Sequence, residues 1–270
     1  MYDMSGKTAV VTGAGGAIGG QIALALAQSG ANVAIWDIAP EAAQRRADEI
    51  NQTGDGRALA AASDVVSKSS VAAALEATVH EFGTVDFLVN GAGGGDKQTT
   101  TSDELTFFDI DPEDTRRVID LNYLSAVIPS QAVGRLFAEK NAGAIVNITS
   151  VGGGLPLSRA LAYSNGKAAA DSFTRWLAVH MAQTYSSQIR VNAVAPGFMI
   201  TDQNRFLLVD EETGDLTSRG NTILSSVPMA RFGNPQEVVG GVLWLLSDQA
   251  TFVTGAVIQI DGGFTAFDGV

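Results

Sequence analysis

Short apolar runs alternate with longer amphipathic or alanine-rich stretches along this chain. The apolar runs have the composition and length of buried strands and lie at residues 7–12, 32–36, 57–62, 85–89, 144–149, 188–194 and 256–260. The longer stretches have the pattern of helices and lie at residues 21–28, 41–50, 69–82, 112–140, 168–179 and 234–246. Strands that alternate with helices form a parallel sheet covered on both faces. The pattern therefore predicts an α/β protein, a single doubly wound domain over residues 1–270.

A glycine-rich turn links the first predicted strand to the first predicted helix. It contains Gly13, Gly15, Gly16, Ala17, Ile18 and Gly19. Glycine lets the backbone approach a pyrophosphate, which then sits at the helix N-terminus. The last glycine comes one residue later than in the usual dinucleotide-binding fingerprint, and tight turns also need glycine. The turn alone therefore fits either a dinucleotide-binding loop or an ordinary tight turn.

Asp37 follows the second predicted strand, at about the offset where a carboxylate binds a ribose 2′-hydroxyl. The alternative is an ordinary loop carboxylate, but the position at a strand end favours the binding role. A 2′-phosphate would be repelled, and no Lys or Arg lies in residues 12–19 or directly after Asp37 to compensate. We therefore expect NAD, with NADP less favoured.

Tyr163 and Lys167 lie four residues apart in a helical pattern, which places them one turn apart on the same face. A phenol titrates near pKa ~10, and a neighbouring ammonium lowers that pKa by favouring the phenolate. The pair can thus transfer a proton, and Ser150, at the end of the preceding strand, can bring its hydroxyl to the same place. The spacing alone also fits a surface tyrosine beside a solvated lysine.

Candidate ligand-binding residues follow nearly every predicted strand. They are the turn at 13–19, Asp37, Asp64, Asn90, Ser150 and the pair Pro196–Gly197. Ligands of doubly wound sheets bind at the carboxyl ends of the strands. This convergence favours a functional interpretation of the tyrosine and lysine. Asn122, inside a predicted helix where asparagine is unfavourable, indicates a kink or a specific hydrogen bond.

Composition narrows the class of protein. The net charge of −12 argues against a nucleic-acid or anionic-membrane partner. The chain has no cysteine, which excludes disulfides and thiolate metal sites, and we expect no metal ion. No signal peptide or bilayer-spanning stretch is visible, so we expect a cytoplasmic protein with a small-molecule substrate.

With these residues in place, the chain resembles the short-chain dehydrogenase/reductase family over residues 5–263. The cofactor loop of that family matches residues 12–19, with Ala17 in place of its middle glycine. Its Asn-Asn-Ala-Gly motif matches residues 90–93, where Gly91 lacks a side chain that usually braces the sheet. Its catalytic set matches Asn122, Ser150, Tyr163 and Lys167. The resemblance implies a Rossmann-type fold with about seven parallel strands and helices on both faces.

The resemblance also implies roles for individual residues in hydride transfer. Tyr163 exchanges the proton, Ser150 binds the reacting oxygen, Lys167 lowers the tyrosine pKa and holds the nicotinamide ribose, and Asn122 anchors a water. The other implied cofactor contacts are Asp37, Asp64, Val65, Asn90, Gly91, Ala92, Gly93, Pro196, Gly197 and Thr201. The family commonly forms tetramers through its two long helices, here those from Pro112 and Tyr163. Phe264 and Phe267 in the apolar tail also favour a homotetramer.

A finer resemblance is to the D-mannonate oxidoreductase, or D-fructuronate reductase, branch. It rests on residues 90–108, 196–205 and 261–270 and implies a sugar-acid substrate. We expect residues 198–218 to close over the substrate as a lid. The basic residues that can meet its carboxylate are Arg159, Arg205 and Lys97, though each also fits a solvated surface charge.

Three alternatives remain. One is a 3-oxoacyl-carrier-protein reductase, against which Asp37 and the acidic charge both weigh. Another is a polyol or gluconate dehydrogenase. The third is a catalytically silent nucleotide-binding regulator, which the presence of Tyr163 and Lys167 disfavours.

Overall fold

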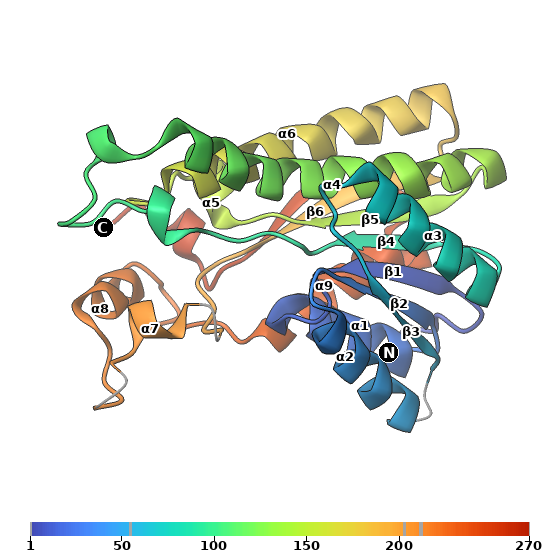
Figure 1. Cartoon of the computed structure of the whole chain (residues 1–270), viewed down its shortest axis with the longest axis horizontal. Coiled ribbons are helices and arrows are strands. Elements are labelled where there is room, and N and C mark those ends of the chain that lie inside the picture. The colour runs from blue at the N-terminus through green and yellow to red at the C-terminus, as the bar shows by residue number, and fades with distance from the viewer. Residues whose placement is uncertain (1, 54–55, 202–203, 211–212, 270) are drawn as a thin grey trace.

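Seven parallel strands form one sheet at the centre of the protein (Figure 1). The computed structural model describes residues 2–53, 56–201, 204–210 and 213–269. The strands are β1 (Thr8–Thr12), β2 (Asn32–Asp37), β3 (Ala58–Ala62), β4 (Phe87–Asn90), β5 (Gly143–Ile148), β6 (Ile189–Pro196) and β7 (Val257–Ile260). Their order is β3-β2-β1-β4-β5-β6-β7, so the direction of winding reverses between β1 and β4. This is the switch point at which doubly wound sheets bind their ligands.

Helices cover both faces of the sheet, as predicted. They are α1 (Ala17–Gln28), α2 (Pro40–Thr53), α3 (Lys68–Phe82), α4 (Pro112–Lys140), α5 (Val151–Gly154), α6 (Leu161–Thr184), α7 (Arg205–Leu208), α8 (Ser218–Ser225) and α9 (Val239–Leu246). Figure 1 shows α3, α4 and α6 above the sheet and α1, α2 and α9 below it. Within the described ranges, no helix is long and apolar enough to cross a membrane.

The burial of both faces explains why the strands read as continuous apolar runs. In β1, Ala9 and Val11 pack in the core on the side of α1, α2 and α9. Val10, between them, packs on the opposite side with residues of α3, α4 and α6. Successive strand side chains point to opposite faces, so a strand covered on both sides is apolar throughout.

Two helix starts differ from the sequence prediction. Helix α1 begins at Ala17, four residues earlier than expected, because the turn glycines continue directly into it. The helix predicted from residue 234 begins as a tight 3₁₀ turn, Pro235–Val238, before α9. There Asn234 caps the turn and Glu237 reaches back to the Asn234 backbone, a reciprocal cap that stabilises this start.

The segment predicted as an irregular lid, residues 198–218, contains regular structure. Helix α7 is followed by an isolated antiparallel bridge between Val209 and Leu216, and α8 begins at Ser218. Thr217 joins the two helices: its hydroxyl donates to the carbonyl of Leu207 at 2.8 Å and caps α8 by accepting the Gly220 N–H. Positions 202–203 and 211–212 of the segment lie outside the described residues.

Candidate active site

The turn between β1 and α1 depends on close backbone contacts. Gly13 has a φ of +65°, and a Cβ there would lie 2.9 Å from the Cα of Ala92. A Cβ at Gly19 would lie 2.5 Å from the carbonyl oxygen of Gly13. Gly16 precedes α1 and gives it no side-chain cap, so the helix begins with free N–H groups. This glycine cradle fits the diphosphate of a dinucleotide.

Asp37 is fixed at the edge of this cradle. One carboxylate oxygen accepts the Gly15 N–H at 2.9 Å, and the other accepts the Ala39 N–H at 2.9 Å. At the end of the neighbouring strand, Asp64 accepts the Val66 N–H at 3.1 Å while Val65 is buried. The arrangement supports binding of an adenosine ribose by Asp37, with Asp64 and Val65 beside it.

Asn90, which we expected to line the cofactor groove, turns its side chain into the protein interior. Its amide donates to the Asn147 side chain at 2.8 Å and to the Ser130 hydroxyl at 3.1 Å. Asn147 in turn donates to the Thr174 hydroxyl at 2.8 Å. The Asn90 side chain therefore braces β4 against β5 and α4, and the contact of this residue with the cofactor stays a prediction.

Gly91 lacks the side chain that was expected to brace the sheet, and the backbone is closely packed at this position. A Cβ at Gly91 would lie 2.7 Å from the carbonyl oxygen of Thr12, so β1 and the end of β4 approach too closely for a side chain there. The Thr12 hydroxyl accepts the N–H groups of Gly91 and Ala92 at 3.0 and 3.2 Å. Backbone contact and the Asn90 bonds together hold this strand end.

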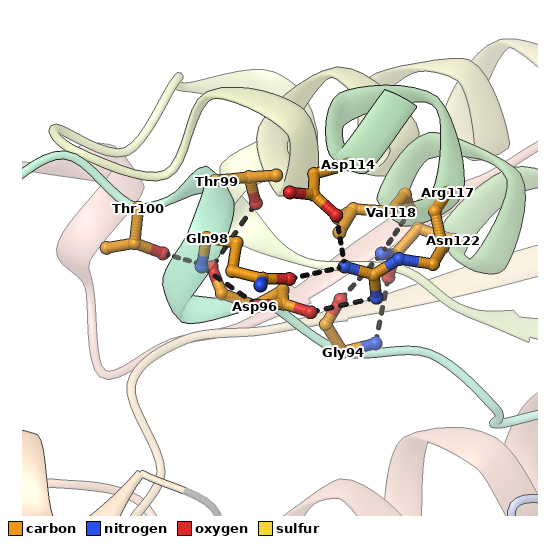
Figure 2. Close-up of polar contacts among 9 residues, drawn as sticks. All are labelled: Gly94, Asp96, Gln98, Thr99, Thr100, Asp114, Arg117, Val118 and Asn122. Carbon is orange, nitrogen blue, oxygen red and sulfur yellow. Dashed lines mark hydrogen bonds and ion pairs between the residues drawn. The ribbon is translucent and has the colours of Figure 1, made fainter. Parts of the chain in front are cut away.

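Gly93, Asn122 and Lys167 meet at one point. A Cβ at Gly93 would lie 2.8 Å from Oδ1 of Asn122 and 3.1 Å from Nζ of Lys167. The Asn122 amide donates to the carbonyls of Gly94 and Val118 at 2.7 and 2.9 Å, and its oxygen accepts the Gly94 N–H at 3.1 Å (Figure 2). Of the two explanations predicted for an asparagine inside this helix, the specific hydrogen bond is confirmed.

Ser150, Tyr163 and Lys167 come together at the end of β5. Ser150 caps α5 by accepting the Gly152 N–H at 3.1 Å, which leaves its own proton free to point toward Tyr163. Lys167 donates to the Ile148 carbonyl at 2.9 Å, and its Nζ lies 5.8 Å from the centre of the Tyr163 ring. The structure thus brings the predicted tyrosine, lysine and serine into one site.

The electrostatics differ from the expectation for Tyr163. Burial raises the pKa of its phenol, and the hydrogen bond with Ser150 opposes that rise only in part. Burial lowers the pKa of Lys167 from 10.5 to about 8, against the opposing charge of Asp171. In this structure desolvation therefore has the largest effect on the tyrosine pKa, and the lowering by the ammonium stays a prediction.

Asp171 is a buried carboxylate that the sequence analysis missed. It is only 5% exposed, and its Oδ1 has no hydrogen-bond partner within the described part of the chain. Burial raises its pKa, while Thr149, Arg175 and Lys167 lower it. Tyr163, Lys167 and Asp171 repeat every four residues along one face of α6, and that spacing was the available signal.

The long segment after Gly93 is ordered against α4 (Figure 2). Arg117 donates to the side chains of Asp96, Gln98 and Asp114 at 2.8, 3.0 and 2.8 Å. The hydroxyls of Thr99 and Thr100 in turn donate to the carbonyl of Asp96. We name residues 94–111 the insert; its first part is held in place by Arg117.

The expected substrate-contact residues lie on separate elements. Arg159 is exposed in the loop before α6, Arg205 is exposed at the start of α7, and Lys97 is exposed at the start of the turn Lys97–Thr99. Thr201, the expected carboxamide contact, donates its N–H to the Asn204 side chain at 2.8 Å. Pro196 ends β6, and Gly197 donates its N–H to the Ile260 carbonyl at 2.9 Å.

These groups together can move a proton beside a bound dinucleotide. A phenol with a neighbouring hydroxyl and ammonium can serve as general acid or base, and the serine hydroxyl can bind a developing oxyanion. Among the residues that the structure describes, no group of three or more acidic or histidine side chains is arranged to hold a metal ion.

Comparison with known proteins identifies the family. A family model described as Enoyl-(Acyl carrier protein) reductase matches residues 13–265. An uncharacterized oxidoreductase of Haemophilus influenzae is 39% identical, over 100% of this chain and 96% of its own. A solved structure of a candidate D-mannonate oxidoreductase from Haemophilus influenza with bound NAD superposes with a TM-score of 0.93, at 39% identity over 100% of this chain and 98% of its own.

A second solved structure has a related fold and a different cofactor. It is a candidate NAD(P)-dependent gluconate 5-dehydrogenase from Beutenbergia cavernae with bound NADP at low occupancy, and it has a TM-score of 0.85. It is 32% identical to this chain and covers 98% of this chain and 99% of its own. The chain, with its glycine cradle and its serine, tyrosine and lysine at the end of β5, belongs to the short-chain dehydrogenase/reductase family of NAD(P)-dependent oxidoreductases.

Proposed function

We propose that the protein transfers a hydride between NAD(H) and a hydroxyl-bearing carbon of a sugar acid, of the D-mannonate and D-fructuronate type. The observation that carries this proposal is the full-length similarity to the candidate D-mannonate oxidoreductase. Residues 90–108, 196–205 and 261–270, which carry the finer resemblance, follow β4, β6 and β7 at the binding edge of the sheet.

The dinucleotide, when bound, supplies or accepts the hydride. In alcohol oxidation, the Tyr163 oxygen takes the substrate hydroxyl proton, and in ketone reduction it returns that proton. The Ser150 hydroxyl binds the reacting oxygen, and Lys167 binds the nicotinamide ribose. Asn122 anchors a water that carries the proton onward, and Thr201 binds the carboxamide.

Specificity for NAD over NADP is also proposed, and it rests on Asp37. Its carboxylate is held at the cofactor loop by two backbone N–H groups, so it cannot swing away from an incoming 2′-phosphate without losing both bonds. Arg46, on α2, is paired with Glu49. A 2′-phosphate would therefore face a negative charge.

Residues 198–218 are proposed to act as a lid, because the described residues of this range lead from the end of β6 to the start of α8 at Ser218. We also propose a homotetramer. Trp176 and Val179 of α6 are large apolar side chains that are more than half exposed, and Phe252 near β7 is fully exposed. A stable monomer in sedimentation velocity at micromolar concentration would contradict the assembly.

The enzymatic alternatives differ in the substrate. The family model's description raises the possibility of an acyl-carrier-protein thioester, and the second solved structure raises that of a gluconate. A carrier protein is acidic and needs a basic docking surface, whereas this chain carries 29 acidic and 17 basic residues. A silent regulator would bind the dinucleotide without turnover.

One substrate panel separates these functions. NADH consumption is measured with keto-uronates, keto-gluconates, neutral ketoses and 3-oxoacyl thioesters at equal concentration. We expect the highest kcat/KM with D-fructuronate. Preference for a neutral ketose or a thioester over every sugar acid would refute the substrate class. NADH binding without turnover on any compound would instead support the regulator.

A further inference from the structure

One buried carboxylate beside the active site has no part in the proposed chemistry. Asp171 of α6 is 5% exposed, and among the described residues its Oδ1 has no hydrogen-bond partner. Burying a carboxyl group is unfavourable unless its neighbours stabilise it. An apolar side chain of similar size would fill the same space without that cost, so the carboxylate calls for a functional explanation.

Asp171 extends the contact that the catalytic side chains of α6 make with the end of β5. Lys167 donates to the Ile148 carbonyl at 2.9 Å. One turn further along α6, the Asp171 carboxyl has a side-chain hydrogen bond with Thr149, the next residue of the chain after Ile148. One turn before the lysine, the catalytic tyrosine has a hydrogen bond with the serine that follows Thr149. Three successive turns of α6 are thus fastened to three successive residues.

The same carboxylate lies against the short helix that Ser150 caps. A Cβ at Gly153 of α5 would lie 2.7 Å from Oδ2 of Asp171 and 2.9 Å from the carbonyl oxygen of Lys167. The Gly153 N–H donates to the Ser150 carbonyl at 2.9 Å, so this glycine belongs to the turn that begins at the serine. The absence of a side chain at Gly153 therefore lets α5 contact both the aspartate and the lysine turn of α6.

Few charged groups surround this carboxylate. Burial raises the pKa of the Asp171 carboxyl, whereas the hydrogen bond with Thr149 and the charges of Arg175 and Lys167 lower it. Burial lowers the pKa of Lys167 from 10.5 to about 8, and the charge of Asp171 opposes that fall. Strand β5 and helix α5 carry no charged side chain, and the α4 side chain beside the lysine is the uncharged Asn122. Among the described residues, Asp171 is thus the negative charge that acts on Lys167.

We propose that Asp171 is a positioning residue, whose ionised carboxylate keeps Lys167 protonated and holds α5, with Ser150, against α6. It acts through the lysine and the serine rather than on the substrate. The inference rests on the roles proposed for Ser150, Tyr163 and Lys167, and it holds for any substrate of the enzyme. Opposite charges favour each other's ionised forms, so without the carboxylate Lys167 loses its proton at a lower pH.

The test compares the pH dependence of kcat/KM in the wild type and in Asp171→Asn. Asparagine keeps the size of the side chain and an oxygen for the hydrogen bond, and it removes the charge. Ketone reduction is measured between about pH 6 and pH 9 at saturating NADH, with the most active compound of the substrate panel. Burial raises the pKa of Tyr163 from 10.0, so the tyrosine keeps its proton in this range and the fall of activity at high pH reports Lys167. Asp48→Asn, exposed on α2, is the charge-matched control.

For the wild type we expect kcat/KM to fall with a midpoint near pH 8, the pKa of Lys167. In Asp171→Asn the midpoint should be lower by about one pH unit, which makes kcat/KM about fivefold lower than in the wild type at pH 8 and nearly equal to it at pH 6. A variant that is only less well packed would lose activity by the same factor at both pH values. Asp48→Asn should match the wild type. An unshifted midpoint in folded Asp171→Asn would overturn the inference.

A second measurement uses the wild-type protein, and it tests the inference even if Asp171→Asn does not fold. Carbon-13 NMR of protein labelled at the aspartate carboxyl carbons follows the protonation of Asp171. The inference requires this carboxylate to be ionised at pH 7, and a protonated carboxyl at that pH would overturn it. A wild-type protein that is inactive with every compound of the panel would refute the proposed function instead.

Discussion

The two ends of the binding edge are built by different means. Around β1, β2 and β4, the cofactor end is made by backbone contacts, such as the approach of Gly19 to the Gly13 carbonyl. At the end proposed for the substrate, after β5 and β6, the edge is formed by loops and short helices, such as the loop in which Arg159 has a φ of +74° and helix α8. Few substitutions are tolerated where backbones pack closely, whereas side chains on loops can be replaced more freely.

This difference indicates which end of the binding edge can determine the substrate specificity. The cofactor end serves every reaction that uses the same dinucleotide, so its construction is tied to one ligand. The substrate end has to differ between enzymes that act on acids, sterols or thioesters. It must vary without disturbing the cofactor end. Tyr163 and Lys167 lie at the boundary between the two ends. Gly93 of the cofactor end is so close to Lys167 that a Cβ at this glycine would lie 3.1 Å from the lysine Nζ.

The largest effect is expected at this boundary. Tyr163→Phe removes one oxygen and should lower kcat/KM by ~10²- to 10⁴-fold, the usual contribution of a general acid or base. NADH affinity should change little, which would separate the chemistry from the cofactor end. Tyr185→Phe, on an exposed tyrosine at the end of α6, is the matched control. Near wild-type turnover in Tyr163→Phe would remove this residue from the proton transfer.

The second-largest effect is expected on the free energy of unfolding. Lys167 is 5% exposed, and burial lowers its pKa from 10.5 to about 8. The folded protein therefore binds fewer protons than the unfolded chain between these two values, so the cost of burying the charge is complete below pH 8 and disappears as the pH rises toward 10.5. Lys167→Met should abolish activity yet stabilise the protein at pH 7 by up to about 3 kcal/mol.

Urea unfolding of both proteins at pH 7 and pH 10 checks this prediction. The stability gap should shrink at the higher pH, because the wild type regains stability there as the folded lysine loses its proton. Lys68→Met, at an exposed position of α3, should show no such gap. A wild type more stable than Lys167→Met at pH 7 would contradict the prediction.

The smallest effect is expected at the cofactor end. Asp37→Asn keeps an oxygen that can accept the Gly15 N–H and removes the negative charge. The ratio of kcat/KM for NADH to that for NADPH should fall by about 10-fold or more, as expected for loss of one charged hydrogen bond. Asp48→Asn, exposed on α2, controls for charge. An unchanged ratio would assign the preference to another residue.

The same contrast explains how much the sequence could predict. The strands of the cofactor end were predictable because their apolar runs are buried on both faces, and the glycine turn has a distinctive composition. The sequence analysis did not predict the direction of the Asn90 side chain. The alternation of side chains along a strand indicates it, because Leu88, two residues earlier, points to the same face and packs on the side of α4 and α6. The helices α7 and α8 after β6 were not predicted, because no local pattern specifies how that segment folds.

The contact between the insert and Arg159 has an evolutionary consequence. The Thr101 N–H donates to the Arg159 carbonyl at 2.9 Å, and Thr101 belongs to a segment that Arg117 fastens to α4. An insertion or deletion between residues 101 and 111 is therefore expected to shift Arg159 while Ser150, Tyr163 and Lys167 stay in place. Changes of loop length can thus alter the surface beside the site, and the core keeps its stability while they do so.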